Sequence, residues 1–336
     1  MPGPLTALHR SIRQLFVRAP QAQRIDLRGR RIVVTGAARG SIGYETARIL
    51  ASWGADVTVS SRSNAQALAA DLRAQLAGVP GCGEIDAHEL DLCETDSVNA
   101  FAAWYRARHG ERLDVLVNNA GVHLDLLSQW KTPHETADGH EIHWRTNYLG
   151  TMQLTMRLLP LLQRTATQTG DARIVNVVSM LHARGRNAWL FAPQERYNSW
   201  VAYGTSKLAL VHASLELQRR YAASANVQAY CLHPGAVYTN IAAKGLAGNP
   251  LLESIRNFFA PVEAFFLLTP QEGAQTQIHC ATRPVARGGL YYRDCRPAPA
   301  SADSADAQVA ARLWQQTQDW IDTRTGGDGS AAGSRA

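Results

Sequence analysis

From residue 31 onward, short runs of apolar and β-branched residues alternate with segments whose apolar residues recur at helical spacing. The first run is Arg31–Thr35, and Ile42, Ile49 and Leu50 then fall on one face of a helix. Further strand-like runs lie at 56–60, 86–90, 114–117, 173–178 and 227–232, with helical segments such as 65–76 between them. This alternation predicts an α/β fold, a single doubly wound parallel sheet with helices on both faces.

Composition and length agree with one large domain. The chain has 336 residues, of which 46% are hydrophobic and 18% charged, so it can bury a sizeable core and is not intrinsically disordered. We find no internal repeat and no linker within the body, which we take to span residues 30–322. The end of the chain, 323–336, is rich in Gly, Ser and Ala and is predicted to be disordered.

The formal charge of +6 is concentrated at the N-terminus. Residues 1–31 carry seven arginines against Asp26 alone, and the rest of the chain is balanced, which argues against nucleic-acid binding. Residues 1–29 form a basic segment with an apolar stripe at helical spacing, made of Leu5, Leu8, Ile12, Leu15 and Phe16. Residues 1–18 could therefore contact an anionic membrane surface, dock on the domain as a helix, or act as an organelle-targeting presequence.

The remaining composition favours a cytoplasmic protein, with a peripheral position at a membrane surface as the alternative. No run approaches the roughly 20 apolar residues of a membrane-spanning helix, and no secretory signal pattern is visible. The five cysteines are scattered without CxxC spacing, as expected in a reducing compartment. His140-Glu-Ile-His143 lacks the spacing of a zinc helix, and we predict no metal.

A glycine-rich loop, Thr35-Gly-Ala-Ala-Arg-Gly-Ser-Ile-Gly43, follows the first predicted strand. At this position glycines let the backbone approach the phosphates of a dinucleotide, although an ordinary tight turn is an equal alternative on the loop alone. The second predicted strand ends without the acid that usually binds the ribose hydroxyls of NAD. Arg39 and Arg62 would instead suit a 2′-phosphate, so together they favour NADP, while either alone could be a surface arginine.

Tyr203-Gly-Thr-Ser-Lys207 places a phenol and an ammonium on one helical face, in a chain with only three lysines. A nearby ammonium stabilises a phenolate and makes proton exchange feasible, whereas the alternative is a surface tyrosine beside a lysine. Ser179 ends an apolar run, where its hydroxyl would face a ligand crevice or cap a helix. Asn118-Asn-Ala-Gly121 follows another run and could shape the crevice wall or form a plain turn.

In this order, these motifs resemble the short-chain dehydrogenase/reductase family over roughly residues 30–322. Asp91, Asn147 and Pro234-Gly235 complete the set, and Thr146-Asn-Tyr-Leu-Gly150 and Thr269-Pro-Gln-Glu-Gly-Ala-Gln-Thr276 are most similar to the retinol dehydrogenase-like branch. The resemblance implies a Rossmann-type sheet and an NADP(H)-dependent interconversion of an alcohol and a carbonyl by hydride transfer. The alternative is a catalytically weak dinucleotide-binding sensor or scaffold of the same fold.

The resemblance also implies roles for individual residues. Tyr203 would exchange a proton with the substrate, and Lys207 would lower its pKa and hold the nicotinamide ribose. Ser179 would polarise the carbonyl, and Asn147 would anchor a water in the proton relay. The implied cofactor contacts are Gly36, Arg39, Gly40, Ser41, Ile42, Gly43, Arg62, Asp91, Leu92, Asn118, Ala120, Gly121, Tyr203, Lys207, Pro234, Gly235, Val237 and Thr239.

The glycine loop is one residue longer than the family's Gly-x-x-x-Gly-x-Gly. Either the loop bulges or Ser41 replaces the middle glycine, and the extra residue is expected to affect cofactor affinity more than the fold.

The substrate side is rich in aromatic residues. The long stretch between Ser179 and Tyr203 contains Trp189, Phe191 and Trp200, and the segment 258–268 contains four phenylalanines. Two such walls suggest a bulky apolar substrate, such as a retinoid, a steroid or a lipid aldehyde. The alternative is that these aromatic residues pack the core or a homodimer interface.

Overall fold

The computed structural model describes residues 19–237, 267–284 and 286–324. The predictions for residues 1–18, Thr239, most of 258–268 and the tail from 325 onward lie outside these residues.

Among the described residues, eight strands form one sheet in the order β3-β2-β1-β4-β5-β6-β7-β8. They are β1 (Arg31–Val34), β2 (Asp56–Ser61), β3 (Ile85–Glu89), β4 (Val115–Asn118), β5 (Ala172–Val177), β6 (Val227–His233), β7 (Tyr291–Arg293) and β8 (Arg296–Pro297). Every neighbouring pair is parallel except β7 and β8, which are antiparallel. The predicted α/β fold is confirmed, with two short edge strands that the sequence patterns did not indicate.

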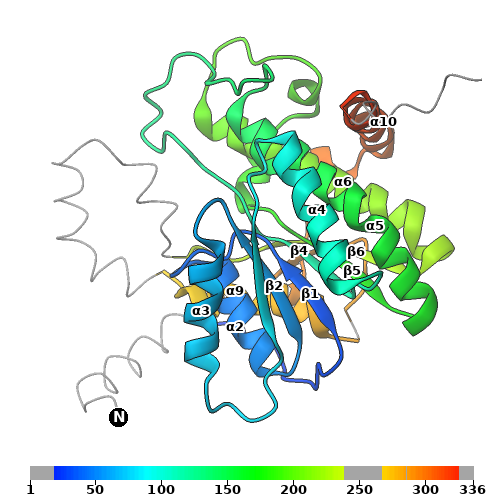
Figure 1. Cartoon of the computed structure of the whole chain (residues 1–336). Coiled ribbons are helices and arrows are strands. Elements are labelled where there is room, and N and C mark those ends of the chain that lie inside the picture. The colour runs from blue at the N-terminus through cyan, green and yellow to red at the C-terminus, as the bar shows by residue number, and fades with distance from the viewer. Residues whose placement is uncertain (1–18, 238–266, 285, 325–336) are drawn as a thin grey trace, which may run out of the picture.

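Helices cover both faces of the sheet (Figure 1). One face carries α2 (Ile42–Ser52), α3 (Ala65–Leu76) and α9 (Pro270–Thr282), and the other carries α4 (Thr95–His109), α5 (Gly150–Thr169) and α6 (Ser199–Ala225). Because successive strand residues point to opposite faces, Val33 joins the core under α4–α6, whereas Ile32 and Val34 join the core under α2, α3 and α9. Helix α10 (Ala307–Thr323) packs against α6.

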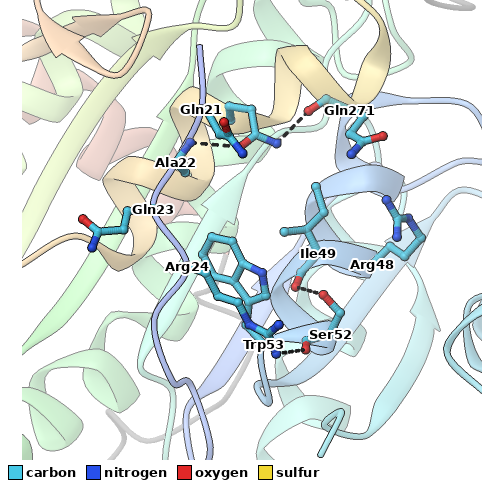
Figure 2. Close-up of a pocket in the computed structure, with 10 residues that line it drawn as sticks. Gln21, Ala22, Gln23, Arg24, Arg48, Ile49, Ser52, Trp53 and Gln271 are labelled. Carbon is cyan, nitrogen blue, oxygen red and sulfur yellow. Dashed lines mark hydrogen bonds between the residues drawn. The ribbon is translucent and has the colours of Figure 1, made fainter. Parts of the chain in front are cut away.

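The described part of the N-terminal segment packs against the domain. The Ala22 amide donates to Gln275 Oε1 of α9 at 3.0 Å, and the buried Leu27 donates its amide to the Trp53 carbonyl at 2.9 Å. An open cavity of about 610 Å³ lies between residues 21–24 and the helices α2 and α9, and no predicted site residue lines it (Figure 2). No helix within the described residues is long and apolar enough to cross a membrane.

The sheet order fixes where a ligand can bind. Strand β1 lies between β2 and β4, so the connections that leave its two sides run in opposite directions. Ligands of doubly wound sheets bind in the crevice outside the carboxyl ends of the strands at this switch point. The glycine loop after β1, the Asn118–Gly121 segment at the end of β4 and Ser179 after β5 all lie at this edge.

Candidate active site

Close packing explains two glycines at the switch point. A Cβ atom on Gly36, whose φ is +67°, would lie 2.7 Å from Ala120 Cα, and one on Gly43 would lie 2.4 Å from Asn119 Nδ2. The two loops are also joined by hydrogen bonds, because Thr35 Oγ1 accepts from the amides of Asn119 and Ala120 at 3.1 and 3.0 Å. Thr35 and Asn119 thus shape the phosphate loop, although the sequence analysis did not assign them to the site.

The extra residue of the glycine loop is accommodated by a bulge. Gly40 has a φ of +75°, but Ser41 has a φ of −95° and so does not adopt the left-handed conformation of a glycine. Ser41 instead caps α2, with its hydroxyl accepting from the Tyr44 amide at 3.1 Å. Helix α2 therefore begins at Ile42 directly after the bulge, with its N-terminus at the crevice where a pyrophosphate would bind.

The two predicted 2′-phosphate ligands lie at the ends of β1 and β2. The Ala37 amide donates to the Ser60 carbonyl at 3.0 Å, which joins the glycine loop to the end of β2 just before the exposed Arg62. Arg39 is 76% exposed and forms an ion pair with Asp71 of α3 at 3.3 Å. An incoming phosphate would therefore compete with Asp71 for Arg39.

The remaining predicted adenosine contacts are held by interactions inside the domain. Asp91 Oδ1 accepts from the Cys93 amide at 2.9 Å, and the carbonyl of buried Leu92 accepts from the fully buried Arg145 at 2.6 Å. Asn118 is buried, and its Nδ2 donates to Thr155 and Asn176, whereas its Oδ1 has no partner. The Asn118 side chain therefore points into the domain rather than along the crevice wall.

Directly after β6, residues 234–237 lie beside Leu268, which comes two residues before α9. Gly235 has a φ of +94° and leaves room for Leu268, which also pairs with Val237 in an isolated bridge. Pro234 directly precedes Gly235. The structure thus positions Pro234, Gly235 and Val237 at the same edge as the other predicted contacts.

Helix α6 presents Tyr203 and Lys207 on one face, as their spacing predicts. The Asn198 side chain caps this helix by accepting from the amides of Trp200 and Val201. Lys207 Nζ donates to the Val177 carbonyl at 3.0 Å and lies 5.7 Å from the centre of the Tyr203 ring.

Ser179 both caps a helix and contacts the phenol. Its hydroxyl accepts from the Leu181 amide at 3.2 Å at the start of the 3-10 helix η2 (Met180–Arg184). The same side chain lies close enough to the Tyr203 phenol to lower the pKa of that phenol, which opposes the effect of burial. The two interpretations of Ser179 are therefore compatible.

Asn147 lies in a π-helical segment, η1 (Trp144–Leu149), that leads into α5. Its Oδ1 accepts from the Val122 amide at 2.8 Å, and its Nδ2 donates to the Val122 carbonyl and to Ser206 Oγ. Short π-helical turns are frequent at functional sites. This one carries Asn147 to the residue next to Lys207, so the four predicted catalytic residues lie together.

Burial sets the protonation of the central pair. It raises the pKa of Tyr203 to about 12, an effect that the nearby Ser179 side chain only partly opposes, and it lowers the pKa of Lys207 to about 8. The lowering of the phenol pKa that the resemblance implies is therefore not found in the protein chain, because desolvation outweighs any stabilisation of the phenolate. At neutral pH the phenol is protonated and can donate a proton.

The histidines beside Tyr203 were not predicted as site residues. His123 stacks on the Tyr203 ring, and the fully buried His143 accepts from the Leu124 amide through Nε2 while its Nδ1 donates to Glu141. Burial and the neighbouring His143 lower the pKa of His123 to about 4, so its ring is neutral. Across the described ranges, no group of three His, Cys, Asp or Glu side chains could hold a metal.

The aromatic residues between Ser179 and Tyr203 divide between the core and the site. Phe191 packs against the core with the Arg312 guanidinium of α10 over its ring, as the core-packing alternative supposed. Trp200 instead contacts His123 edge to face and donates its Nε1 hydrogen to the Leu126 carbonyl. Met180, directly after Ser179, is 56% exposed, and Leu127 is 38% exposed.

A doubly wound sheet with a glycine loop at its switch point and a tyrosine–lysine pair at the same edge defines a class of dinucleotide-dependent oxidoreductases. Comparison with known proteins identifies the family. Residues 30–249 match the short chain dehydrogenase family, and the chain belongs to the short-chain dehydrogenase/reductases, enzymes that act on CH–OH groups.

Its relatives include retinol dehydrogenases. The chain is 35% identical to retinol dehydrogenase 11 of Homo sapiens over 91% of its own length and 93% of that protein. It is 36% identical to human retinol dehydrogenase 14 over 86% of its length and 85% of that protein. Among solved structures, the Pseudomonas aeruginosa RhlG/NADP complex is 26% identical, with a TM-score of 0.58 over 79% of this chain and 94% of that one.

Proposed function

We propose that this enzyme is an NADP(H)-dependent oxidoreductase that interconverts a bulky apolar alcohol and its carbonyl compound, with Tyr203 as the general acid and base. The observation that carries the proposal is the grouping of Tyr203, Lys207, Ser179 and Asn147 at the carboxyl edge of the sheet beside the glycine loop. The same edge fits a dinucleotide, because the glycine loop leads directly into α2 and brings the N-terminus of this helix to the crevice.

When bound, the nicotinamide cofactor supplies or accepts the hydride. In the direction of reduction, Tyr203 donates its proton to the carbonyl oxygen, for which its raised pKa keeps it protonated. Ser179 donates a hydrogen bond to the same oxygen and stabilises the charge that develops there. Lys207, held by the Val177 carbonyl, lies next to Gly121 and holds the ribose. Asn147 is hydrogen-bonded to Val122 and Ser206 and so holds the loop after β4 against helix α6, next to Lys207.

The exposed apolar side chain of Met180, directly after Ser179 in the chain, supports a large apolar substrate, as do the names of the retinol dehydrogenase relatives. Met180 and Leu127 would face solvent unless a ligand covered them. The test is an NADPH-oxidation assay across retinals, steroid ketones and long-chain lipid aldehydes, with short polar aldehydes as the matched control. We expect turnover of at least one bulky class. Tight NADPH binding without turnover of any carbonyl would support a sensor instead.

The cofactor preference can be tested at the two arginines. Arg62→Ala is expected to weaken NADPH binding by about 10- to 100-fold and to leave NADH binding within about twofold, because a charge-assisted pair with a phosphate contributes roughly 1.5–3 kcal/mol. Arg39→Ala should have a smaller effect, since Asp71 already pairs with Arg39 in the free protein. Fluorescence titration with both cofactors measures these affinities. Equal losses for NADPH and NADH would rule out a 2′-phosphate contact.

A further inference from the structure

His123 lies inside the candidate site and is held there from both sides. Its ring stacks on the Tyr203 ring, with the centroids 4.2 Å apart and the planes 12° from parallel. Before it, both backbone groups of Val122 are bonded to Asn147, and after it, the Leu124 amide donates to His143 Nε2 at 2.9 Å. Asn147 and His143 therefore fix the backbone on both sides of the imidazole.

The neighbours of His123 are themselves fixed. Glu141 accepts from His143 Nδ1 at 2.6 Å, from the Trp144 amide at 2.8 Å and from the Tyr197 hydroxyl at 3.0 Å. This carboxylate leaves His143 in one tautomer, protonated on Nδ1. His143 Nε2 is then an acceptor that the Leu124 amide already occupies, so His143 cannot hydrogen-bond His123.

The His123 side chain has an unused hydrogen-bonding atom. His123 is 5% exposed, and its Nε2 is buried without a hydrogen-bond partner. Buried polar atoms without partners also occur elsewhere in the domain, for example on His212 and Gln277. His123 differs from these because its ring lies directly against the phenol that we propose as the proton donor. A buried nitrogen without a partner is costly, and a ligand that supplies one removes this cost.

We infer that His123 forms a hydrogen-bonding subsite for a second oxygen of the substrate, on the carbon next to the reacting carbonyl. This inference rests on the proposed function, because it takes the carbonyl oxygen to lie at the Tyr203 hydroxyl. The neutral imidazole can donate or accept a hydrogen bond at Nε2, depending on its tautomer. A hydroxyl group can accept or donate in return. The preferred substrates are thus apolar α-hydroxy ketones, whose hydroxyl group would contact His123.

The test compares a long-chain α-hydroxy ketone with the methyl ketone of the same chain length in the full-length enzyme. His123→Phe keeps an aromatic ring to stack on Tyr203 but removes both nitrogens. We expect this variant to lower the kcat/KM ratio of hydroxy ketone to plain ketone by about 10- to 100-fold, with kcat for the plain ketone within about threefold of wild type. His123→Gln, which retains polar atoms, should restore part of the ratio. Using the ratio cancels the different intrinsic reactivities of the two ketones.

Binding provides a second reading that does not depend on turnover. Calorimetric titration with the α-hydroxy ketone, in protein loaded with tetrahydro-NADP, a redox-inactive analogue of NADPH, should show a similar loss of affinity in His123→Phe. The thermal unfolding midpoint of each variant reports whether it is folded. Equal ratios and equal affinities in wild type and His123→Phe would overturn the inference. Absence of turnover in wild type with an intact difference in affinity would instead count against the proposed function while supporting the subsite.

Discussion

Tyr203→Phe is expected to lower kcat by roughly 10²–10⁴-fold, the usual contribution of a positioned proton donor. The change removes one oxygen atom and leaves the ring, so the stack on His123 and the packing around Lys207 are kept. Affinity for NADPH should therefore change by less than about threefold. Steady-state NADPH oxidation with the best carbonyl substrate gives kcat, and fluorescence titration gives the affinity.

Tyr221→Phe is the matched control, because Tyr221 lies on the same helix and packs against Trp314 of α10, away from the crevice. It should behave as wild type. Activity of Tyr203→Phe within tenfold of wild type would remove Tyr203 from the chemistry. Loss of both activity and NADPH binding would show that the hydroxyl acts mainly in holding the cofactor.

The fold was predictable because buried strands and helices leave local patterns of apolar residues in the sequence. Six parallel strands and the helix at 65–76 were found within a residue or two, since most of these strands are rich in apolar and β-branched residues and are buried, β4 and β5 along their whole length. Strands β7 and β8 were not found because they have three and two residues and include charged ones. Strand β7 depends on pairing with β6, which is a long-range contact that no local pattern records, and β8 in turn pairs only with β7.

In the candidate site, the residues that belong to a recognisable sequence motif were predicted. Residues that are placed in the site only by the packing of the fold were not. Tyr203 and Lys207 were predicted from their helical spacing, from the scarcity of lysines in the chain and from the family resemblance. The ion pair of Arg39 joins it to Asp71, which lies 32 positions away on another helix. In the π-helical turn that carries Asn147, each hydrogen bond spans five residues instead of the four of an α-helix. This difference is too small to change the spacing of apolar residues in the sequence. A lone histidine such as His123 has no sequence signature, and only the fold places it on the phenol.

The pH dependence of the reaction should identify the charge state of Lys207. Burial lowers the pKa of Lys207 to about 8, below the ordinary value of 10.5, so its ammonium is present below pH 8 and is lost as the pH rises through this value. The value of kcat/KM for NADPH, which reports groups of the free enzyme, should be level from about pH 6 to 7.5 and fall about tenfold per unit above pH 8. Tyr203 is not the source of this limb, because its pKa is about 12.

Substitutions at Lys207 test further whether Lys207, and not Tyr203, causes the alkaline limb. Lys207→Met should reduce kcat/KM by roughly 10²–10³-fold, as the loss of a fixed charge in a buried site does, and should abolish the alkaline limb. Lys207→Arg retains a charge that does not titrate, so its profile should stay level to at least pH 10 even though the larger guanidinium lowers the rate. The exposed Lys131→Met removes the same charge outside the crevice and should keep both the rate and the limb. An alkaline limb that survives in Lys207→Arg would belong to another group. The Lys207 side chain would then act only by holding the Val177 carbonyl and the ribose. In that role, the loss of its proton would not control the rate.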